Sequence, residues 1–230
     1  MNLTPFLFVN NPNTRAYVET FGAVRIQLFR RDREGVERYV NSIMAFCEEQ
    51  KMEFWLGFVK TIKGWTLAEQ GCYQLAIDTI QEGMEAFEKK ASMFKPHCYA
   101  LLAQAYAGCD RTDESLRVLD DALVIAHSTA EHWITPELHR LKGEILLQAD
   151  RAPDVTAAAE SCFEQSLAIA RGRTAKSWEL RAATSLARLW QYQGKRAEAH
   201  KLLSEKYQWF TEGFDTKDLR DAKALLDGLK

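Results

Sequence analysis

The segment RLWQYQGKRAEAHKLL (residues 188–203) joins two apolar, alanine-bearing stretches through one glycine and a short basic turn. Within it, Ala199 follows Gly194 by five residues, and an apolar residue comes four positions later. The segment GCYQLAIDTI (residues 71–80) has the same spacing of glycine, alanine and apolar residue. We therefore interpret the two segments as copies of one structural unit.

A small or apolar anchor residue stands seven positions before each of these turns. Successive anchors are 40, 39, 40 and 44 residues apart, and the longest interval holds four additional residues within RAPDVTAAA (151–159). A period near 40 with helical spacing inside each unit is typical of stacked helical hairpins. Small residues allow the two helices of a hairpin to cross closely, so we expect Gly64 to lie against Ala76. The anchors are Val24, Gly64, Ala103, Gly143 and Ala187.

Apolar residues between the anchors follow the spacing of a helix face, as Ile134, Leu138, Leu141 and Ile145 do, and not the alternation of a strand. The last segment has an apolar stripe typical of an amphipathic helix, with Asp215 as its predicted N-cap. The sequence therefore predicts an all-α fold: a right-handed α-solenoid of about five helical hairpins plus a C-terminal capping helix.

We expect residues 1–230 to form a single helical-repeat domain. No polar capping helix precedes the first hairpin, so we also expect the chain to be a segment of a longer protein. The predicted parts are an irregular lead at 1–12, hairpins at about 13–51, 53–91, 95–128, 132–172 and 174–212, and the capping helix at 215–229.

Composition argues against several classes of protein. The formal net charge of −2 does not favour nucleic-acid or anionic-membrane binding. The five cysteines are odd in number and lack CxxC spacing, which predicts a reduced, cytoplasmic protein with no disulfide framework. No apolar run approaches the roughly 20 residues that span a bilayer. His132 and His139 have no cysteine or carboxylate at metal-ligand spacing, so we expect no metal, no cofactor and no enzyme activity.

The repeat resembles the tetratricopeptide repeat in having a small residue at position 8, glycine at 15, alanine at 20 and an apolar residue at 24. Position 4, which is usually aromatic, holds Lys60, Tyr99, His139 and Ala183 in this chain, so the match to the repeat is loose there. HEAT-like packing, whose period is also about 40, is the alternative fold.

Longer stretches resemble the C-terminal repeat region of large bacterial signalling proteins, in which a class III nucleotide cyclase or a DNA-binding domain precedes a STAND-type ATPase. The GxxxxGK[ST] motif of an ATPase is absent from this chain, so the resemblance implies no ATPase activity here. It implies a sensor or scaffold arm that binds protein partners and controls attached ATPase or cyclase domains. The stretches are WTLAEQG (65–71), ELHRLKGEILL (137–147), AKSWELRAATSLARLW (175–190) and WFTEGFDTKDLRDAKALLDGL (209–229).

Three other functions remain open: a free-standing adaptor, an oligomerisation scaffold that pairs with a second copy, and, less favoured, a nucleic-acid-binding helical repeat. The sequence offers no nucleophile, acid–base pair or metal set that would favour an enzyme.

The tetratricopeptide resemblance also implies a concave groove lined by positions 2, 5, 9, 12 and 13 of each first helix. Such a groove would have an aromatic N-terminal half and a basic C-terminal half, and would fit a peptide with apolar anchors and acidic residues. The competing interpretation is that the aromatic residues pack the hairpins and the arginines are solvated. The Lys and Asn of the chaperone-type carboxylate clamp are missing at positions 5 and 9. The predicted groove residues are Phe21, Arg25, Phe58, Trp65, His97, Gln104, Arg140, Glu144, Arg181, Thr184, Arg188 and Tyr192.

Overall fold

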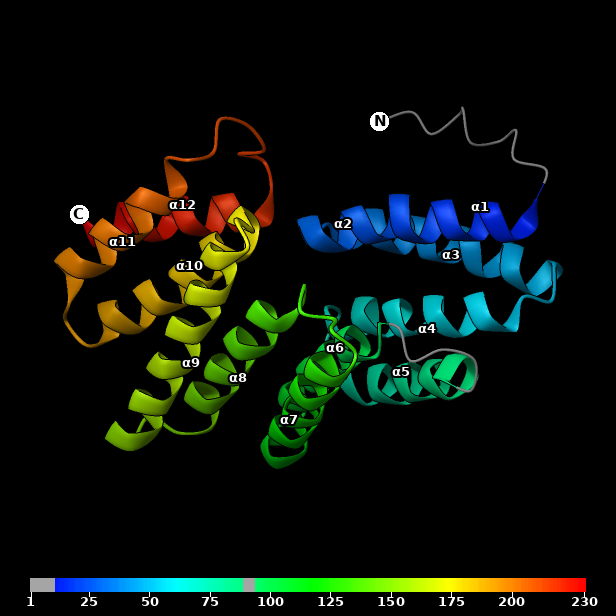
Figure 1. The fold of residues 1–230 in the computed structure, drawn as a ribbon, viewed down its shortest axis with the longest axis horizontal. Helices are drawn as coiled ribbons and strands as arrows, with labels where there is room; N and C mark the ends of the chain where they lie inside the picture. The colour runs from blue at the N-terminus through cyan, green and yellow to red at the C-terminus, as the bar shows by residue number, and fades with distance from the viewer. Residues whose placement is uncertain (1–10, 89–93) are drawn as a thin grey trace. The chain divides into compact units, whose positions relative to one another are not determined.

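The computed structural model describes residues 11–88 and 94–230, and all regular structure in these two ranges is helical (Figure 1). The predicted all-α class is therefore confirmed. The chain divides into two compact units, Met1–Cys109 and Asp110–Lys230. The single-domain organisation stays a prediction, and most of the predicted irregular lead lies outside the described residues. None of the described helices has the length and apolarity needed to cross a membrane.

The first unit begins with one long helical run whose middle turn is π-helical. In this turn the backbone N–H of Arg25 donates to the carbonyl oxygen of Thr20, five residues earlier. The regular helical spacing of the sequence does not predict this wider turn. The elements of the unit are α1 (Pro12–Val18), η2 (Glu19–Val24), α2 (Arg25–Arg30), α3 (Arg33–Glu49), α4 (Glu53–Ala68), α5 (Tyr73–Glu88) and α6 (Lys95–Gly108).

Helices α4 and α5 cross where the repeat places small residues. A Cβ atom on Gly64 would lie 2.9 Å from the carbonyl oxygen of Ala76 and 2.3 Å from Cγ1 of Ile80. No side chain fits in such a space, and the predicted close approach of Gly64 to Ala76 is confirmed. Around the crossing, Ile77 and Ile80 are fully buried.

The second unit repeats this arrangement in its own hairpins. A Cβ atom on Gly143 would lie 3.0 Å from the carbonyl oxygen of Ala159 and 2.6 Å from the Phe163 ring. The elements of the unit are α7 (Thr112–Ser128), α8 (Thr135–Ala149), α9 (Pro153–Gly172), α10 (Lys176–Tyr192), α11 (Arg196–Tyr207) and α12 (Lys217–Leu229).

Helix α12 packs its apolar stripe against the core of the second unit. Leu219, Ala222, Leu226 and Leu229 are buried in one cluster with side chains of α9, α10 and α11. The N-cap prediction was wrong by one residue. Thr216, whose backbone is extended, precedes the first helical residue, and its hydroxyl donates to the carbonyl oxygen of Gly213 instead of capping the helix.

Most hairpin turns use a left-handed residue at the position that the repeat assigns to glycine. Gly71 and Gly194 have φ values of 81° and 80°, and Arg31 and Asp110 at the same repeat position have 55° and 58°. A left-handed residue after a helix lets its own N–H group and that of the next residue donate to the last carbonyl oxygens of the helix. In the turn at Gly194, the N–H of Lys195 donates to the carbonyl of Trp190 at 2.8 Å. The segment 188–203 is therefore one hairpin turn of several.

Replacing the crossing glycine is expected to force α4 and α5 apart. Gly64→Val should lower the free energy of unfolding by about 3 kcal/mol, because the α5 backbone and Ile80 must move to admit the side chain. The measurement is urea unfolding followed by circular dichroism. Gly172→Val is the control, since nothing lies within 4 Å of a Cβ there, and its effect should stay within about 0.5 kcal/mol. Equal losses in the two variants would contradict the close crossing.

Candidate interaction site

Three of the predicted groove residues meet in an aromatic cluster of the first unit. The Phe21 ring centroid lies 5.5 Å from that of Phe58 and 4.8 Å from that of Phe94. The Arg25 guanidinium lies 4.8 Å from the Phe94 centroid. Phe58 of α4 is only 3% exposed, so its ring belongs to the packed interior. Phe21 and Arg25 are half-buried.

Two further aromatic residues join this cluster that were not predicted. Tyr17 is 56% exposed and lies 4.9 Å from Phe21 between ring centroids, and Trp55 lies 5.9 Å from Phe21. Tyr17 is four residues before Phe21, and Trp55 three before Phe58. Residues at these spacings share a helix face, which is the sequence signal that would have identified them.

The other predicted residues of the first unit are inside the packing. Trp65 is 5% exposed and His97 is 5% exposed, so neither offers a side chain to a partner. Gln104 is half-buried, and its amide nitrogen donates to the carbonyl oxygen of Ala100 at 3.0 Å on its own helix. Burial therefore supports the packing interpretation for Trp65 and His97.

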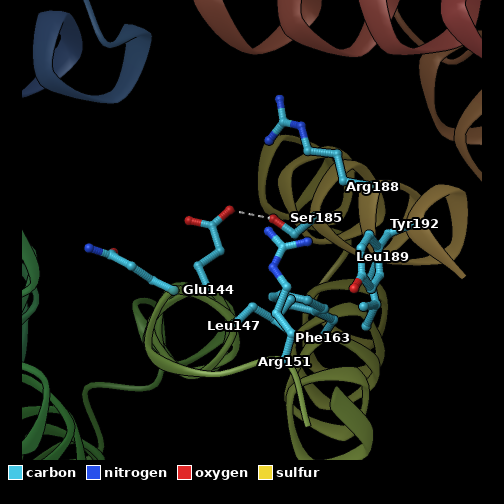
Figure 2. Close-up of a pocket in the computed structure, with 9 residues that line it drawn as sticks. Glu144, Leu147, Arg151, Phe163, Ser185, Arg188, Leu189 and Tyr192 are labelled. Carbon is cyan, nitrogen blue, oxygen red and sulfur yellow. Dashed lines mark hydrogen bonds between the residues drawn. The ribbon is translucent and has the colours of Figure 1, made fainter. Parts of the chain in front are cut away.

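The second unit contains a groove of about 320 Å³ between α8, α9 and α10. Three predicted residues line it: Glu144, Arg188 and Tyr192. Phe163 is 1% exposed and contributes an apolar wall, whereas Tyr192 is 62% exposed. Figure 2 shows these side chains around one space. The lining also includes Leu147, Gln148, Arg151, Ser185 and Leu189, which were not predicted.

Arg140 does not face a partner; it is a buried link beneath the groove. Its guanidinium donates two hydrogen bonds of 2.8 Å to Glu137 and forms a 2.5 Å ion pair with Glu144. Burial alone would lower the pKa of Arg140, but the two carboxylates raise it above its ordinary value. Arg140 therefore stays charged and holds Glu144 in place.

Glu144 connects this buried pair to the groove. Burial would raise its pKa, but the charge of Arg140 and a 2.8 Å hydrogen bond from the Ser185 hydroxyl hold the pKa below its ordinary value. The dashed line in Figure 2 marks the Ser185 bond. Glu144 is therefore an ionised wall of the groove, with its charge already balanced by Arg140.

Arg181 and Thr184 serve the packing of α10. The Arg181 guanidinium donates to Asp218 of α12 at 2.6 Å and lies 3.5 Å from Glu137 of α8. The buried Thr184 hydroxyl donates to the carbonyl oxygen of Leu180, one turn earlier. A chain of charges thus joins α8, α10 and α12.

A second buried charge network was missed by the sequence. Glu179 of α10 is 2% exposed and accepts hydrogen bonds from Lys176 at 2.8 Å and from Lys206 of α11 at 3.0 Å. Burial would raise the pKa of Glu179, but these lysines keep it below its ordinary value of 4.5. The network therefore ties α10 to α11 through a carboxylate that is ionised at neutral pH.

Among the described residues, no group of three or more His, Cys, Asp or Glu side chains is arranged to hold a metal ion. The groove lining offers two guanidinium groups, the carboxylate of Glu144, the Tyr192 ring and apolar side chains.

Comparison with known proteins identifies the fold. No family model matches the chain, and no curated protein matches its sequence. A putative kinesin light chain of Podosopora anserina, described as having nearly identical TPR-like repeats, is similar in structure, with a TM-score of 0.54 and 16% identity. That match covers 94% of this chain and 98% of the other. The chain has a tetratricopeptide-like repeat fold.

Two further solved structures agree with the tetratricopeptide-like fold. A variant of the Podosopora anserina protein has a TM-score of 0.52 and 18% identity, covering 90% of this chain and 95% of the other. A Signal Transduction ATPase with Numerous Domains from Pyrococcus horikoshii, described as having a tetratricopeptide repeat sensor, has a TM-score of 0.51 and 13% identity. That match covers 99% of this chain and 40% of the ATPase.

Within this tetratricopeptide-like fold, the predicted groove residues separate by exposure. The buried ones, which serve packing, are Phe58, Trp65, His97, Arg140 and Thr184. Those with exposed or half-buried side chains are Phe21, Arg25, Gln104, Glu144, Arg188 and Tyr192. The side chain of Arg181 is only 10% exposed and is held by Asp218.

Removing the buried arginine is expected to destabilise the second unit strongly. Arg140→Met leaves the carboxylate of Glu137 buried without its bidentate partner and should cost about 3–5 kcal/mol of unfolding free energy. Lys223→Met, which removes the exposed pair with Asp227, should leave the unfolding midpoint almost unchanged. Thermal and urea unfolding check both. A small loss for Arg140→Met would mean that water reaches this network.

The Glu179 network predicts a dependence of stability on pH. Because the folded pKa of Glu179 is depressed, its stabilisation is present at neutral pH and is lost as the pH falls below its ordinary value of 4.5 through the folded pKa. Glu179→Gln should therefore lower the melting temperature at pH 7 and flatten its decline between about pH 5 and pH 3. Thermal unfolding across this range is the measurement. An unchanged slope would show that Glu179 does not carry the effect.

Proposed function

We propose that this chain is a non-enzymatic protein–protein interaction module, the sensor or scaffold arm of a larger bacterial signalling ATPase or nucleotide cyclase in the cytoplasm. The observation that carries the proposal is the groove between α8, α9 and α10, where Arg188 and Tyr192 are exposed beside an apolar wall. Arginine and tyrosine beside apolar surface are the composition typical of protein-binding hot spots.

The Pyrococcus horikoshii ATPase supports the regulatory part of the proposal, because its description includes a tetratricopeptide repeat sensor. This chain spans 40% of that protein's length, so the attached ATPase or cyclase belongs to the proposal alone. In this arrangement a partner binds the exposed side chains of the repeat, and the occupied repeat controls the effector.

Groove binding can be tested by photo-crosslinking in cells that make the protein. A benzophenone amino acid replacing Tyr192 should form an adduct with one partner protein, or with the attached effector domain. Arg188→Glu should lower the adduct yield by about fivefold or more, because it reverses a charge in the same groove. The adduct is quantified by immunoblot and identified by mass spectrometry.

Val124 of α7 provides the matched control position, since it is 68% exposed and does not line the groove. The same benzophenone group at Val124 should give no such adduct. Equal adducts at the two positions would contradict the groove as the binding surface. A crosslink to a second copy of the chain would replace the sensor-arm proposal with an oligomerisation scaffold.

A further inference from the structure

In the hairpin of α8 and α9, four additional residues lie between the helix crossing and its partner alanine. Helix α8 ends at Ala149, six residues after Gly143, whereas α4 ends at Ala68, four residues after Gly64. Helix α9 likewise begins six residues before its crossing alanine, at Pro153. The additional residues therefore lengthen the part of each helix that lies beyond the crossing, and they move the connecting turn outward.

The turn of this hairpin also has a different backbone. At the position where other hairpins have a left-handed residue, Asp150 is extended, with φ −153° and ψ 156°. Its carboxylate accepts hydrogen bonds from the backbone N–H groups of Arg151 at 2.6 Å and Ala152 at 3.1 Å. The carbonyl oxygen of Arg151 accepts a 3.3 Å hydrogen bond from the Thr156 hydroxyl. The backbone of Arg151 is therefore fixed by side chains on both sides of it.

The side chain of Arg151 crosses from this turn to the end of α10. Its guanidinium carbon lies 4.7 Å from the Tyr192 ring centroid, within the range of a cation–π contact. Figure 2 shows the side chain between α8 and α10, beside Phe163. Stacking on the ring leaves the N–H groups of the guanidinium plane able to donate to a ligand.

Positive charge exceeds negative charge around this groove. Glu144 is balanced by Arg140 at 2.5 Å. Arg188 lies 3.9 Å from Asp221, which is paired more closely with Lys217 at 2.9 Å. Within the second unit, Asp110–Lys230, no carboxylate forms an ion pair with Arg151. Two guanidinium groups thus favour an anionic ligand.

The opposite wall of the groove offers an acceptor. Both the Arg140 pair and the Ser185 hydrogen bond use Oε1 of Glu144, whose side chain is 39% exposed. Oε2 receives no donor from the part of the chain that the structure describes, so it can accept a backbone N–H. A peptide supplies such a donor next to a carboxylate side chain, whereas a simple small carboxylate does not.

We propose that this groove recognises a peptide segment in which an acidic residue adjoins an aromatic or large aliphatic residue. Arg151 and Arg188 receive the acidic side chain, and the apolar side chain lies against the half-buried Leu147, above the buried Phe163 ring that closes the groove from below. This inference rests on the proposed function and names the ligand class of the same site. It differs from the chaperone-type clamp, because the deciding cation comes from the turn between α8 and α9 and not from a lysine of a first helix.

Fluorescence anisotropy with labelled hexapeptides tests the ligand class on the full chain. The probe Gly-Ser-Phe-Asp-Gly-Ser should bind, Gly-Ser-Phe-Asn-Gly-Ser should bind about tenfold more weakly, and Gly-Ser-Ala-Asp-Gly-Ser about fivefold more weakly. Arg151→Ala should weaken the Phe-Asp probe about tenfold while leaving the Phe-Asn probe nearly unchanged, so that the two probes become alike.

Arg173→Ala is the matched control, since Arg173 is exposed and lies in the turn between α9 and α10. This turn is at the opposite end of α10 from Tyr192, and the helix is about 24 Å long. It should change the affinity of every probe less than twofold. Circular dichroism of Arg151→Ala should match the wild type, because the side chain is exposed.

Three results would overturn the inference: equal binding of the Phe-Asp and Phe-Asn probes, equal losses in Arg151→Ala and Arg173→Ala, or phenylacetate displacing the probe with the same affinity as the peptide. The last would make the groove a site for small carboxylates. A persistent crosslink at position 192 without peptide binding would overturn the ligand class alone. Peptide binding that depends on Arg151, without any crosslink, would retire only the proposed function.

Discussion

The close approach of helix backbones at small residues is the constraint on which the other features of the fold depend. At Gly64 and Gly143, a single added carbon would reach the carbonyl oxygens of Ala76 and Ala159 at 2.9 and 3.0 Å. Because the helices cross this tightly, the neighbouring apolar side chains interlock in a dry core, and the side chains of α8 and α10 are held at a fixed separation. The groove beside Phe163 exists only while that separation is kept.

Charged residues fix the register of the helices in the second unit, which its apolar core alone does not fix. Arg140 and Arg181 join α8, α10 and α12, and Glu179 joins α10 to α11. Hydrogen-bonded ion pairs require a definite geometry, whereas apolar side chains tolerate some sliding of one helix along another. The two networks therefore set the helical register, and the Arg140 network also orients Glu144 at the groove.

The helices and the crossings at Gly64 and Gly143 were predictable because a small or apolar anchor residue recurs in the sequence at a nearly constant interval. Which of the predicted groove residues are exposed and which are buried was harder to predict. The repeat frame placed both Arg140 and Arg188 in the groove. In the structure Arg140 is only 8% exposed, because it pairs with Glu137 one turn before it. Arg188 has no carboxylate at that spacing and is exposed. Arg151 lies in a turn that departs from the repeat, so a frame based on the repeat could not include it. The π-helical turn at Glu19–Val24 likewise has no signal in residue spacing.

The left-handed turns at Arg31 and Asp110 show that the hairpin turn does not require glycine. A residue other than glycine costs about 1–2 kcal/mol in that conformation, yet these turns keep the shape of those at Gly71 and Gly194. The hairpin therefore keeps its fold despite the conformational free-energy cost at these turn residues, because the close crossing of its helices is unchanged. Such tolerance allows the sequences of the repeats to diverge while their backbone geometry stays alike. It also allows the sequence of one hairpin to change without disturbing the packing of its neighbours.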